Sequence, residues 1–164
     1  PGVTLVIHSA DCVPLFFLDP VRRAAGLAHA GWRGTAAGIG AETVRVMERE
    51  FGTAPGDLVC GIGPSIGPCC FEVHAPVYEI FAAKRELSPA EWTREDGGGK
   101  YHVDLWEANR RVLMRAGVPE RNISVSGICT KCHADLLYSH RATGGKRGGL
   151  AASLTIREGG PNAD

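Results

Sequence analysis

Apolar residues dominate the first 30 positions of the chain, in two runs. Residues 3–18 are rich in Val, Leu, Ile and Phe and end at Asp19-Pro20, a pair typical of turns. A second, shorter apolar run covers residues 23–30. Short apolar runs bounded by turn residues are typical of strands, so this pattern predicts two neighbouring strands joined by a tight turn.

Helical spacing follows the second run. Side chains recur there at the intervals of one helix face, at Ile39, Thr43, Val46, Met47 and Phe51. Thr35 can cap the N-terminus of such a helix, and Gly52 can end it in the left-handed conformation. The pattern therefore predicts one helix between Thr35 and Gly52, with the turn of residues 31–34 at its N-terminus.

Strands and helices are mixed along the rest of the chain. We predict strands at 58–62, 123–128, 136–138 and 150–156, helices at 76–84 and 105–116, and Gly-rich loops at 63–68 and 96–99. This mixture predicts an α/β (α+β) fold, with layered mixed sheets and flanking helices in a single domain over residues 1–164. Since the chain enters its first strand almost at once, we expect this domain to lack an N-terminal segment.

The composition is that of an ordinary folded domain, with 44% apolar residues. Eighteen basic residues balance eighteen acidic ones, so no net charge favours a nucleic acid or an anionic membrane as partner. No stretch approaches the roughly 18–20 apolar residues of a membrane span, and no export signal is evident. We therefore expect a cytoplasmic protein, in which the six cysteines serve as thiols or ligands rather than disulfides.

Candidate metal chemistry lies at the break in the first apolar run. Asp11-Cys12 interrupts that run and His29 lies near the end of the second, so neighbouring strands can bring the thiol and the imidazole together. These groups are typical ligands of zinc or copper, although a buried thiol and a satisfied core histidine are the alternative interpretation. His8 lies four residues before Cys12, roughly 13 Å along a strand, which is too far for a shared metal.

Two other segments carry candidate functional residues. Arg33 lies at the predicted helix N-terminus, where backbone N–H groups and a guanidinium suit a phosphate. Arg141 and Arg147 lie near a Gly-rich segment that is either a flexible basic turn or an anion clamp.

A group of cysteines is harder to interpret. Cys129-Thr-Lys-Cys132-His133 matches C-x-x-C-H, which indicates haem attachment or half of a zinc knuckle. No second C-x-x-C exists, and the vicinal pair Cys69-Cys70 suits neither a knuckle nor an easy disulfide. We therefore predict local structural or redox roles for the C-x-x-C segment.

Several motifs, taken in order, resemble one known family. They are Ala10-Asp11-Cys12-Val13-Pro14, His29-Ala30-Gly31-Trp32-Arg33-Gly34, residues 63–73, Cys129-Thr130 and Ser139-His140-Arg141. Together they resemble the YfiH-like family, also called the laccase-domain or polyphenol oxidoreductase family. The resemblance implies a layered α/β fold and a metal, zinc or alternatively copper, held by two histidines and one cysteine. Cys12 and His29 match two of these ligands, and the third is expected upstream of residue 1.

The resemblance implies purine nucleoside phosphorolysis with adenosine deamination, polyphenol oxidation, or editing of peptidoglycan precursors. We predict the first, a metal-dependent purine nucleoside phosphorylase that uses a nucleoside and phosphate. One metal with an open position can activate water, while Arg33 and Arg141 can bind the anion. In this hypothesis Cys12 and His29 bind the metal, and Asp11 orients them or exchanges protons.

Three alternatives stay open. Cys12 could be the nucleophile of a cysteine-dependent hydrolase or editing factor, with His29 as its base. A single-copper polyphenol oxidoreductase is a second possibility, but a multicopper cluster is disfavoured because the six histidines include no His-x-His pair. A binding module without catalysis is the third.

Overall fold

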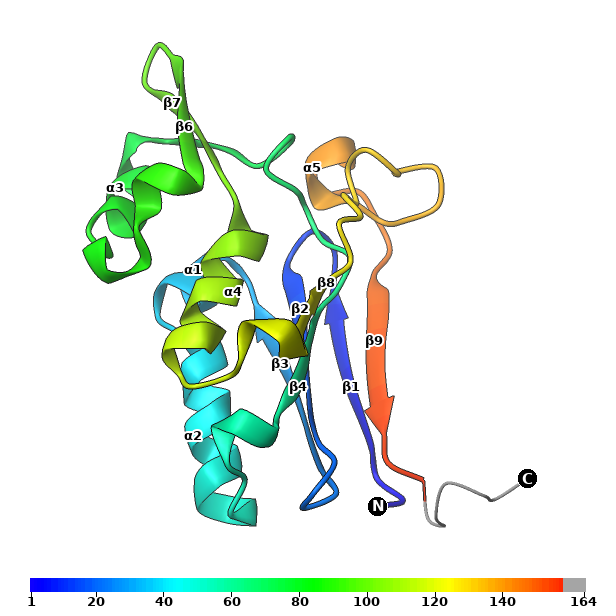
Figure 1. Ribbon diagram of the computed structural model, residues 1–164. Helices are drawn as coiled ribbons and strands as arrows, with labels where there is room; N and C mark the ends of the chain where they lie inside the picture. The colour runs from blue at the N-terminus through cyan, green and yellow to red at the C-terminus, as the bar shows by residue number, and fades with distance from the viewer. Residues whose placement is uncertain (158–164) are drawn as a thin grey trace.

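The computed structural model of the chain describes residues 1–157, so residues 158–164 of the predicted domain lie outside the described part (Figure 1). The strands are β1 (Thr4–Ser9), β2 (Val13–Asp19), β3 (Ala24–Ala30), β4 (Val59–Ile62), β5 (Glu72–His74), β6 (Thr93–Gly97), β7 (Lys100–Val103), β8 (Ile123–Val125) and β9 (Leu150–Thr155). The helices are α1 (Trp32–Ala36), α2 (Ile39–Phe51), α3 (Ala75–Ala82), α4 (Leu105–Arg115) and α5 (His140–Thr143), with short 3₁₀ turns η1 (Pro55–Asp57), η2 (Arg85–Leu87), η3 (Pro89–Glu91) and η4 (Glu120–Asn122).

The central sheet has the strand order β3-β2-β4-β8. Strand β2 is antiparallel to both β3 and β4, whereas β4 and β8 are parallel. Leu15 and Phe17 of β2 are fully buried on one face, because alternate residues of a strand point the same way. Helices α2 and α4 cover that face, and Leu113 of α4 lies beside Leu15 around Gly40 of α2 (Figure 1). This apolar layer is the main core of the domain.

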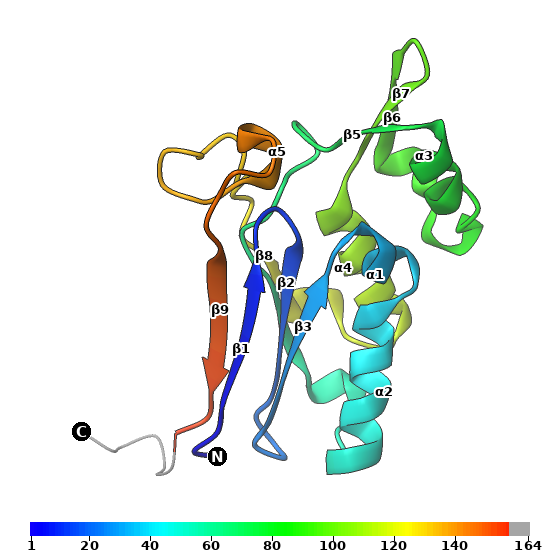
Figure 2. The same ribbon diagram turned by 180° about the vertical axis from the view of Figure 1, so that it is seen from behind.

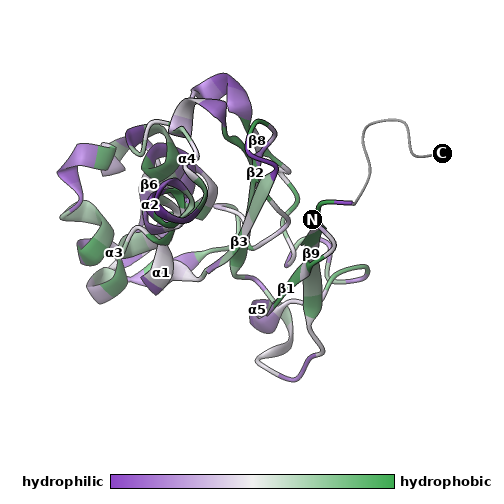
Figure 3. Cartoon of the chain, turned by 90° about the horizontal axis from the view of Figure 1, so that it is seen from below, coloured by the Kyte–Doolittle hydropathy of each residue, from purple (hydrophilic) through white to green (hydrophobic). Residues whose placement is uncertain are grey.

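A second, two-stranded sheet lies across the other side of the central sheet. Strand β1 pairs antiparallel with β9, from Thr4 opposite Thr155 to Ser9 opposite Leu150. Seen from below, α2 and α4 lie on one side of β2 and β3, and the β1–β9 pair lies on the other (Figure 3). Strand β1 runs beside β3 in the view from behind (Figure 2).

The third sheet, β5-β7-β6, packs with α3 at one end of the molecule (Figure 1). Phe81 of α3 and Trp92 meet edge to face at 5.7 Å between ring centroids, and Tyr78 stacks on Tyr101 of β7. In the described residues no helix is both long and apolar enough to cross a membrane. The mixed, layered α+β architecture agrees with the predicted fold class.

The main correction to the predicted elements concerns the first apolar run, which was predicted as one strand. Residues 3–18 are not one strand, because β1 and β2 belong to different sheets and are separated by residues 10–12. Asp11 has a φ of 81°, a left-handed conformation that a continuous strand excludes. The predicted tight pairing of the second run with the first is confirmed, since β2 and β3 form an antiparallel hairpin.

The predicted helix between Thr35 and Gly52 also divides. Thr35 is not an N-cap; it is buried inside the short helix α1, and its hydroxyl accepts a hydrogen bond from Asn109 Nδ2 at 3.0 Å. Gly38, with a φ of 77°, separates α1 from α2, whereas Gly52 ends α2 at a φ of 65° as predicted. The turn of residues 31–34 therefore opens α1 and does not precede the long helix.

Most of the remaining predicted elements are confirmed with small shifts of their ends, as β4, α3, α4, β8 and β9. The predicted strand at 136–138 is wrong, because these residues form turns and extended loop. The sequence pattern also missed the β6–β7 hairpin, whose turn lies in the predicted Gly-rich loop 96–99.

Candidate metal and active site

Asp11 lies at the junction of the two sheets and is nearly buried. Thr130 Oγ1 donates a hydrogen bond to one carboxylate oxygen at 2.6 Å, and the Arg141 backbone N–H donates to the other at 2.7 Å. The carbonyl of Asp11 accepts from the Ile66 N–H at 2.9 Å. Asp11 therefore joins three segments that are far apart in the sequence, and both of its carboxylate oxygens are engaged.

Cys12 and His29 are brought together by the β2–β3 hairpin. Pro14 of β2 lies opposite His29 of β3, so Cys12 is only two residues from the position that faces His29. A Cβ atom built on Gly31 would lie 3.1 Å from Cys12 Sγ and 3.9 Å from His29 Nε2. The thiol and the imidazole therefore flank the same point, and we call them the Cys12–His29 pair.

His8 orients the imidazole of this pair through its backbone. His29 Nδ1 lies 3.0 Å from the His8 carbonyl oxygen, which can only accept a hydrogen bond. In the neutral imidazole the N–H is therefore on Nδ1, and Nε2 keeps a free lone pair. A carbonyl partner on the far nitrogen is the usual support of a histidine that binds a metal. The side chain of His8 is exposed.

The electrostatic surroundings of Cys12 are mixed. Burial raises the pKa of the Cys12 thiol above its usual value, the Asp11 carboxylate raises it further, and Arg147 lowers it. Without a cation the protonated thiol is therefore favoured, and a divalent cation beside it would favour the thiolate. One thiol and one free imidazole nitrogen fit zinc chemically. Within residues 1–157, no ligand group of three or more His, Cys, Asp or Glu side chains includes either residue.

The predicted anion-binding arginines differ in their surroundings. Arg33 lies in α1 rather than before α2, and its exposed guanidinium lies 4.2 Å from the centroid of the Trp32 ring. Arg141 Nη1 donates to the Glu72 carbonyl at 2.9 Å and lies 3.4 Å from the Cys70 carbonyl. The Arg141 side chain thus holds a neighbouring loop, whereas that of Arg33 is free to meet a solute.

An apolar cavity of about 280 Å³ lies between the central sheet and the β1–β9 sheet. Its lining residues are Ser9, Pro14, Phe16, Pro64, Leu137, Leu150, Ala151, Ala152 and Ser153. Pro14 and Phe16 alternate along β2 with the buried Leu15, so they share a strand face with Cys12. The cavity therefore lies on the same side of the sheet as the Cys12–His29 pair.

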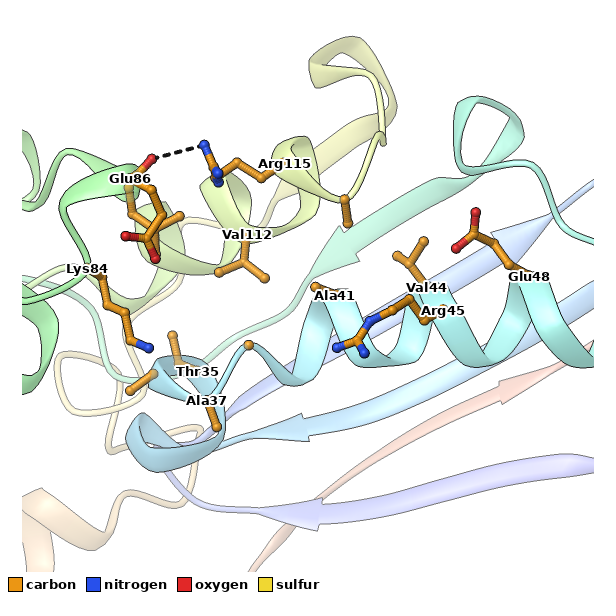
Figure 4. Close-up of a pocket in the computed structure, with 14 residues that line it drawn as sticks. Thr35, Ala37, Ala41, Val44, Arg45, Glu48, Lys84, Glu86, Val112 and Arg115 are labelled. Carbon is orange, nitrogen blue, oxygen red and sulfur yellow. Dashed lines mark hydrogen bonds between the residues drawn. The ribbon is translucent and has the colours of Figure 1, made fainter.

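A second hollow of about 400 Å³ lies between α1, α2, α4 and the segment around η2 (Figure 4). Arg45, Lys84 and Arg115 line it together with Glu48 and Glu86, so its charges are mixed. None of the predicted site residues lines this hollow.

Four cysteines that the sequence divided between two motifs meet at the loop end of the central sheet. The Sγ atoms of Cys69, Cys70, Cys129 and Cys132 all lie within 4.8 Å of one another, and we call this set the four-cysteine cluster. The sequence interpretation counted only the C-x-x-C pair as a partial knuckle and set the vicinal pair aside. The sequence did contain a signal for this cluster, namely that the two short loop motifs together provide four thiols, the number that a closed metal site needs.

Glu72, Asp96 and His102 form another group of potential ligands. His102 Nδ1 lies 2.6 Å from the Pro68 carbonyl oxygen, and His102 Nε2 lies 3.0 Å from Asp96 Oδ2. Both ring nitrogens are therefore already engaged, and ion pairing accounts for this group.

Comparisons with known proteins agree with this fold. A sequence profile of the family described as "Multi-copper polyphenol oxidoreductase laccase" matches residues 1–157. Purine nucleoside phosphorylase YlmD of Geobacillus stearothermophilus is 44% identical over 158 residues, which are 96% of this chain and 57% of that protein. Adenosine deaminase RL5, from an unknown prokaryotic organism, is 37% identical over 143 residues, 87% of this chain and 54% of that protein.

A solved structure gives the same result. The crystal structure of the Bacillus licheniformis hypothetical protein YfiH matches with a TM-score of 0.92 and 39% identity, covering 96% of this chain and 59% of that one. The predicted YfiH-like fold is therefore confirmed. The chain spans somewhat more than half the length of these relatives.

Proposed function

The chain belongs to the multi-copper polyphenol oxidoreductase laccase family, and on that premise we propose that the protein is a metal-dependent purine nucleoside phosphorylase that also deaminates adenosine. Relatives are named for each of these two activities. The observation that carries the proposal is the Cys12–His29 pair, whose thiol and Nε2 atom both lie within 4 Å of the point where a Cβ of Gly31 would stand, while His29 Nδ1 is held by the His8 carbonyl.

We assign the metal to Cys12 and His29, and zinc rather than copper, because neither reaction transfers electrons. A mixed sulfur and nitrogen set with an open position is typical of catalytic zinc. When bound, the metal supplies Lewis-acid activation of the attacking oxygen. The third ligand expected from the family resemblance, a histidine upstream of residue 1, is not among the described residues.

The protein's own groups orient this pair. The His8 carbonyl fixes the His29 tautomer and ring direction through the 3.0 Å contact with Nδ1. Asp11 fixes the backbone that carries Cys12, because its two carboxylate oxygens are held by Thr130 and Arg141. We therefore assign Asp11 as a positioning residue rather than an acid or base.

Phosphorolysis requires a phosphate and a nucleoside to lie together. A phosphate oxygen bonds to the ribose carbon while the bond to the base breaks, and the base leaves with a proton. We propose that the apolar cavity beside Pro14 and Phe16 takes the purine, since flat apolar walls suit a base. Arg147, whose charge lowers the pKa of Cys12, and the exposed Arg33 would bind the phosphate.

A cysteine-dependent hydrolase is the second candidate, favoured by the imidazole beside Cys12. In this alternative Cys12 is the nucleophile and His29 its base. The raised pKa of Cys12 speaks against it, because the thiolate is the reactive form. An electrophile that inactivates metal-free, active protein by modifying Cys12 would favour this alternative.

We also propose that the enzyme works in the cytoplasm and that residues 1–164 belong to one YfiH-like domain. In that reducing compartment the six cysteines would serve as thiols or metal ligands rather than form disulfides.

The proposed function is tested with the full-length protein, inosine and inorganic phosphate. We expect release of hypoxanthine that depends on phosphate and on bound zinc, and release of ammonia from adenosine. The proposal is wrong if zinc-loaded protein releases no base from inosine, adenosine or guanosine in the presence of phosphate.

A further inference from the structure

We propose that the four-cysteine cluster binds one zinc ion as a closed structural site, separate from the Cys12–His29 pair. The inference goes beyond the proposed function and does not depend on it. Cys69 and Cys70 come from the loop between β4 and β5, and Cys129 and Cys132 from the segment after β8. A site built from these four thiols would cross-link two segments that are far apart in the sequence.

The sulfur positions match a tetrahedral zinc site. A Zn–S bond of about 2.3 Å places the sulfurs of a regular tetrahedron roughly 3.8 Å apart. Cys132 Sγ lies 3.6 Å from Cys69 Sγ and 3.5 Å from Cys70 Sγ, and all four sulfurs lie within 4.8 Å of one another. A disulfide would need about 2.05 Å between two sulfurs. The spacing therefore fits a shared cation between four separate thiolates.

The backbone around the cluster is arranged to hold it. The loop turns at Gly67, whose carbonyl accepts from the N–H groups of Cys70 and Phe71 at 2.9 Å each. Gly67 N–H donates to Cys129 Sγ at 3.3 Å, a contact that favours a thiolate. A Cβ on Gly67 would lie 2.7 Å from the Trp106 ring, so this close approach requires glycine.

The second segment is tied to the first by main-chain hydrogen bonds. Ser65 N–H donates to the Ile128 carbonyl at 3.2 Å, and Thr130 N–H donates to the Ser65 carbonyl at 3.0 Å. Cys129 lies opposite Ser65 in an isolated parallel bridge. Main-chain hydrogen bonds therefore hold the two halves of the cluster in register.

If all four thiols lost their protons, four negative charges would repel one another in a small volume unless a cation were bound between them. Burial raises the pKa of Cys69 and raises that of Cys70 to about 11. Burial also opposes ionisation of Cys129, but the Gly67 N–H and neighbouring donors lower its pKa to about 7. Zinc would displace the thiol protons to solvent and neutralise two of the four negative charges.

A complete four-thiolate set leaves no open coordination position, which is typical of structural rather than catalytic zinc. Thr130 follows Cys129 directly, and its hydroxyl holds the Asp11 carboxylate. The Arg141 guanidinium lies 3.4 Å from the Cys70 carbonyl, and the backbone N–H of the same residue donates to the other Asp11 oxygen. The zinc would therefore stabilise the loops that position Asp11 and, next to it, Cys12.

The test uses the Cys12→Ala variant of the full-length protein, so that the first site does not contribute zinc. After removal of loosely bound metal we expect about one zinc per chain, with four sulfur neighbours at about 2.3 Å by X-ray absorption. Replacement of zinc by Co²⁺ should give the intense visible bands of tetrahedral thiolate coordination. These measurements leave the cluster unmutated and so do not depend on a variant that could fail to fold.

A double variant, Cys12→Ala with Cys132→Ser, should lose at least nine-tenths of this zinc, whereas Cys12→Ala with Cys60→Ser should retain it. Cys60 is a buried cysteine of β4 and not a member of the cluster, so it is the matched control. The proposal is overturned by folded protein without bound zinc, by an oxygen and nitrogen shell around the zinc, or by a disulfide among these cysteines in protein purified under reducing conditions.

Discussion

The Cys12–His29 pair and the four-cysteine cluster both contain thiols but differ in composition and in how they are assembled: the pair adds an imidazole nitrogen, whereas the cluster has four sulfurs. The pair comes from one hairpin, with Cys12 directly before β2 and His29 on β3, and its two side chains are an incomplete ligand set. The cluster joins two loops that are far apart in the sequence: Cys132 contacts Cys69 and Cys70, which precede it by 63 and 62 residues. An open set suits catalysis, whereas a closed set suits cross-linking of loops. Loss of the first should therefore remove activity, and loss of the second should remove stability.

The largest effect is expected for Cys12→Ala. We expect the kcat/KM for inosine phosphorolysis to fall at least about 100-fold, because even partners of metal ligands contribute 10–100-fold. Thermal unfolding of zinc-loaded protein should stay within about 3 °C of the wild type, since the thiol is only half-buried. Steady-state kinetics and calorimetry measure the two quantities.

Cys60→Ala is the matched control for that variant, because Cys60 is also a free thiol but lies in the core. It should keep wild-type kcat/KM and lose some stability. Equal activity of Cys12→Ala and the wild type would contradict the catalytic assignment of the pair.

Asp11→Asn tests the connection between the two regions. The amide would direct an N–H₂ group at either the Thr130 hydroxyl or the Arg141 N–H, both of which donate to the carboxylate. We expect the free energy of unfolding to fall by about 1.5–3 kcal/mol in urea denaturation, as for hydrogen bonds to a charged group.

Asp135→Asn, at an exposed aspartate, should change this free energy by less than about 0.5 kcal/mol. If both variants unfold alike, Asp11 does not hold the two regions together.

Gly31→Ala perturbs the pair by its shape alone. Gly31 has a φ of −64° and a ψ of 168°, which alanine also adopts, but the added Cβ would lie 3.1 Å from Cys12 Sγ. A displacement of a few tenths of an ångström should lower kcat/KM by about 10-fold. Gly56→Ala is the control, because nothing lies within 4 Å of its added Cβ. A Gly31→Ala enzyme as active as the Gly56→Ala enzyme would show that this point is not the reacting centre.

The smallest effect is expected for Arg147→Gln. An exposed cation contributes about 0.2–1 kcal/mol to an ion pair, so the KM for phosphate should rise by roughly two- to fivefold with little change in kcat. Arg121→Gln, at another exposed arginine, should leave the KM for phosphate unchanged. An unchanged KM in Arg147→Gln would remove this residue from the phosphate site.

The sequence pattern predicted the local elements better than their partners. The hairpin of β2 and β3, helix α4 and the end of α2 at Gly52 follow from periodicity and turn residues within a few positions. The division at residues 10–12 did not, because one polar interruption in an apolar run does not show that β1 pairs with β9 rather than continuing into β2. Thr35 was misplaced because its hydroxyl is used by Asn109 of α4.

The candidate site shows the same limit. Cys12 and His29 were identified from residue type, strand position and motif, and their proximity required only one hairpin. The role of the His8 carbonyl was not predicted, because a backbone contact leaves no mark in residue identity. The contacts of the Arg141 guanidinium with the carbonyls of a loop far away in the sequence were also not predicted.

Residue patterns and motifs were enough to predict the mixed α+β class, the family resemblance, and Cys12 and His29 as candidate ligands at one hairpin. These depend on interactions between residues close in the chain, whose periodicity and turn chemistry can be read directly. Only the tertiary structure decided that Asp11 joins three distant segments and that two unrelated cysteine motifs form one cluster. Such contacts depend on how loops close over 60 or more residues, and local preference contains no information about that closure.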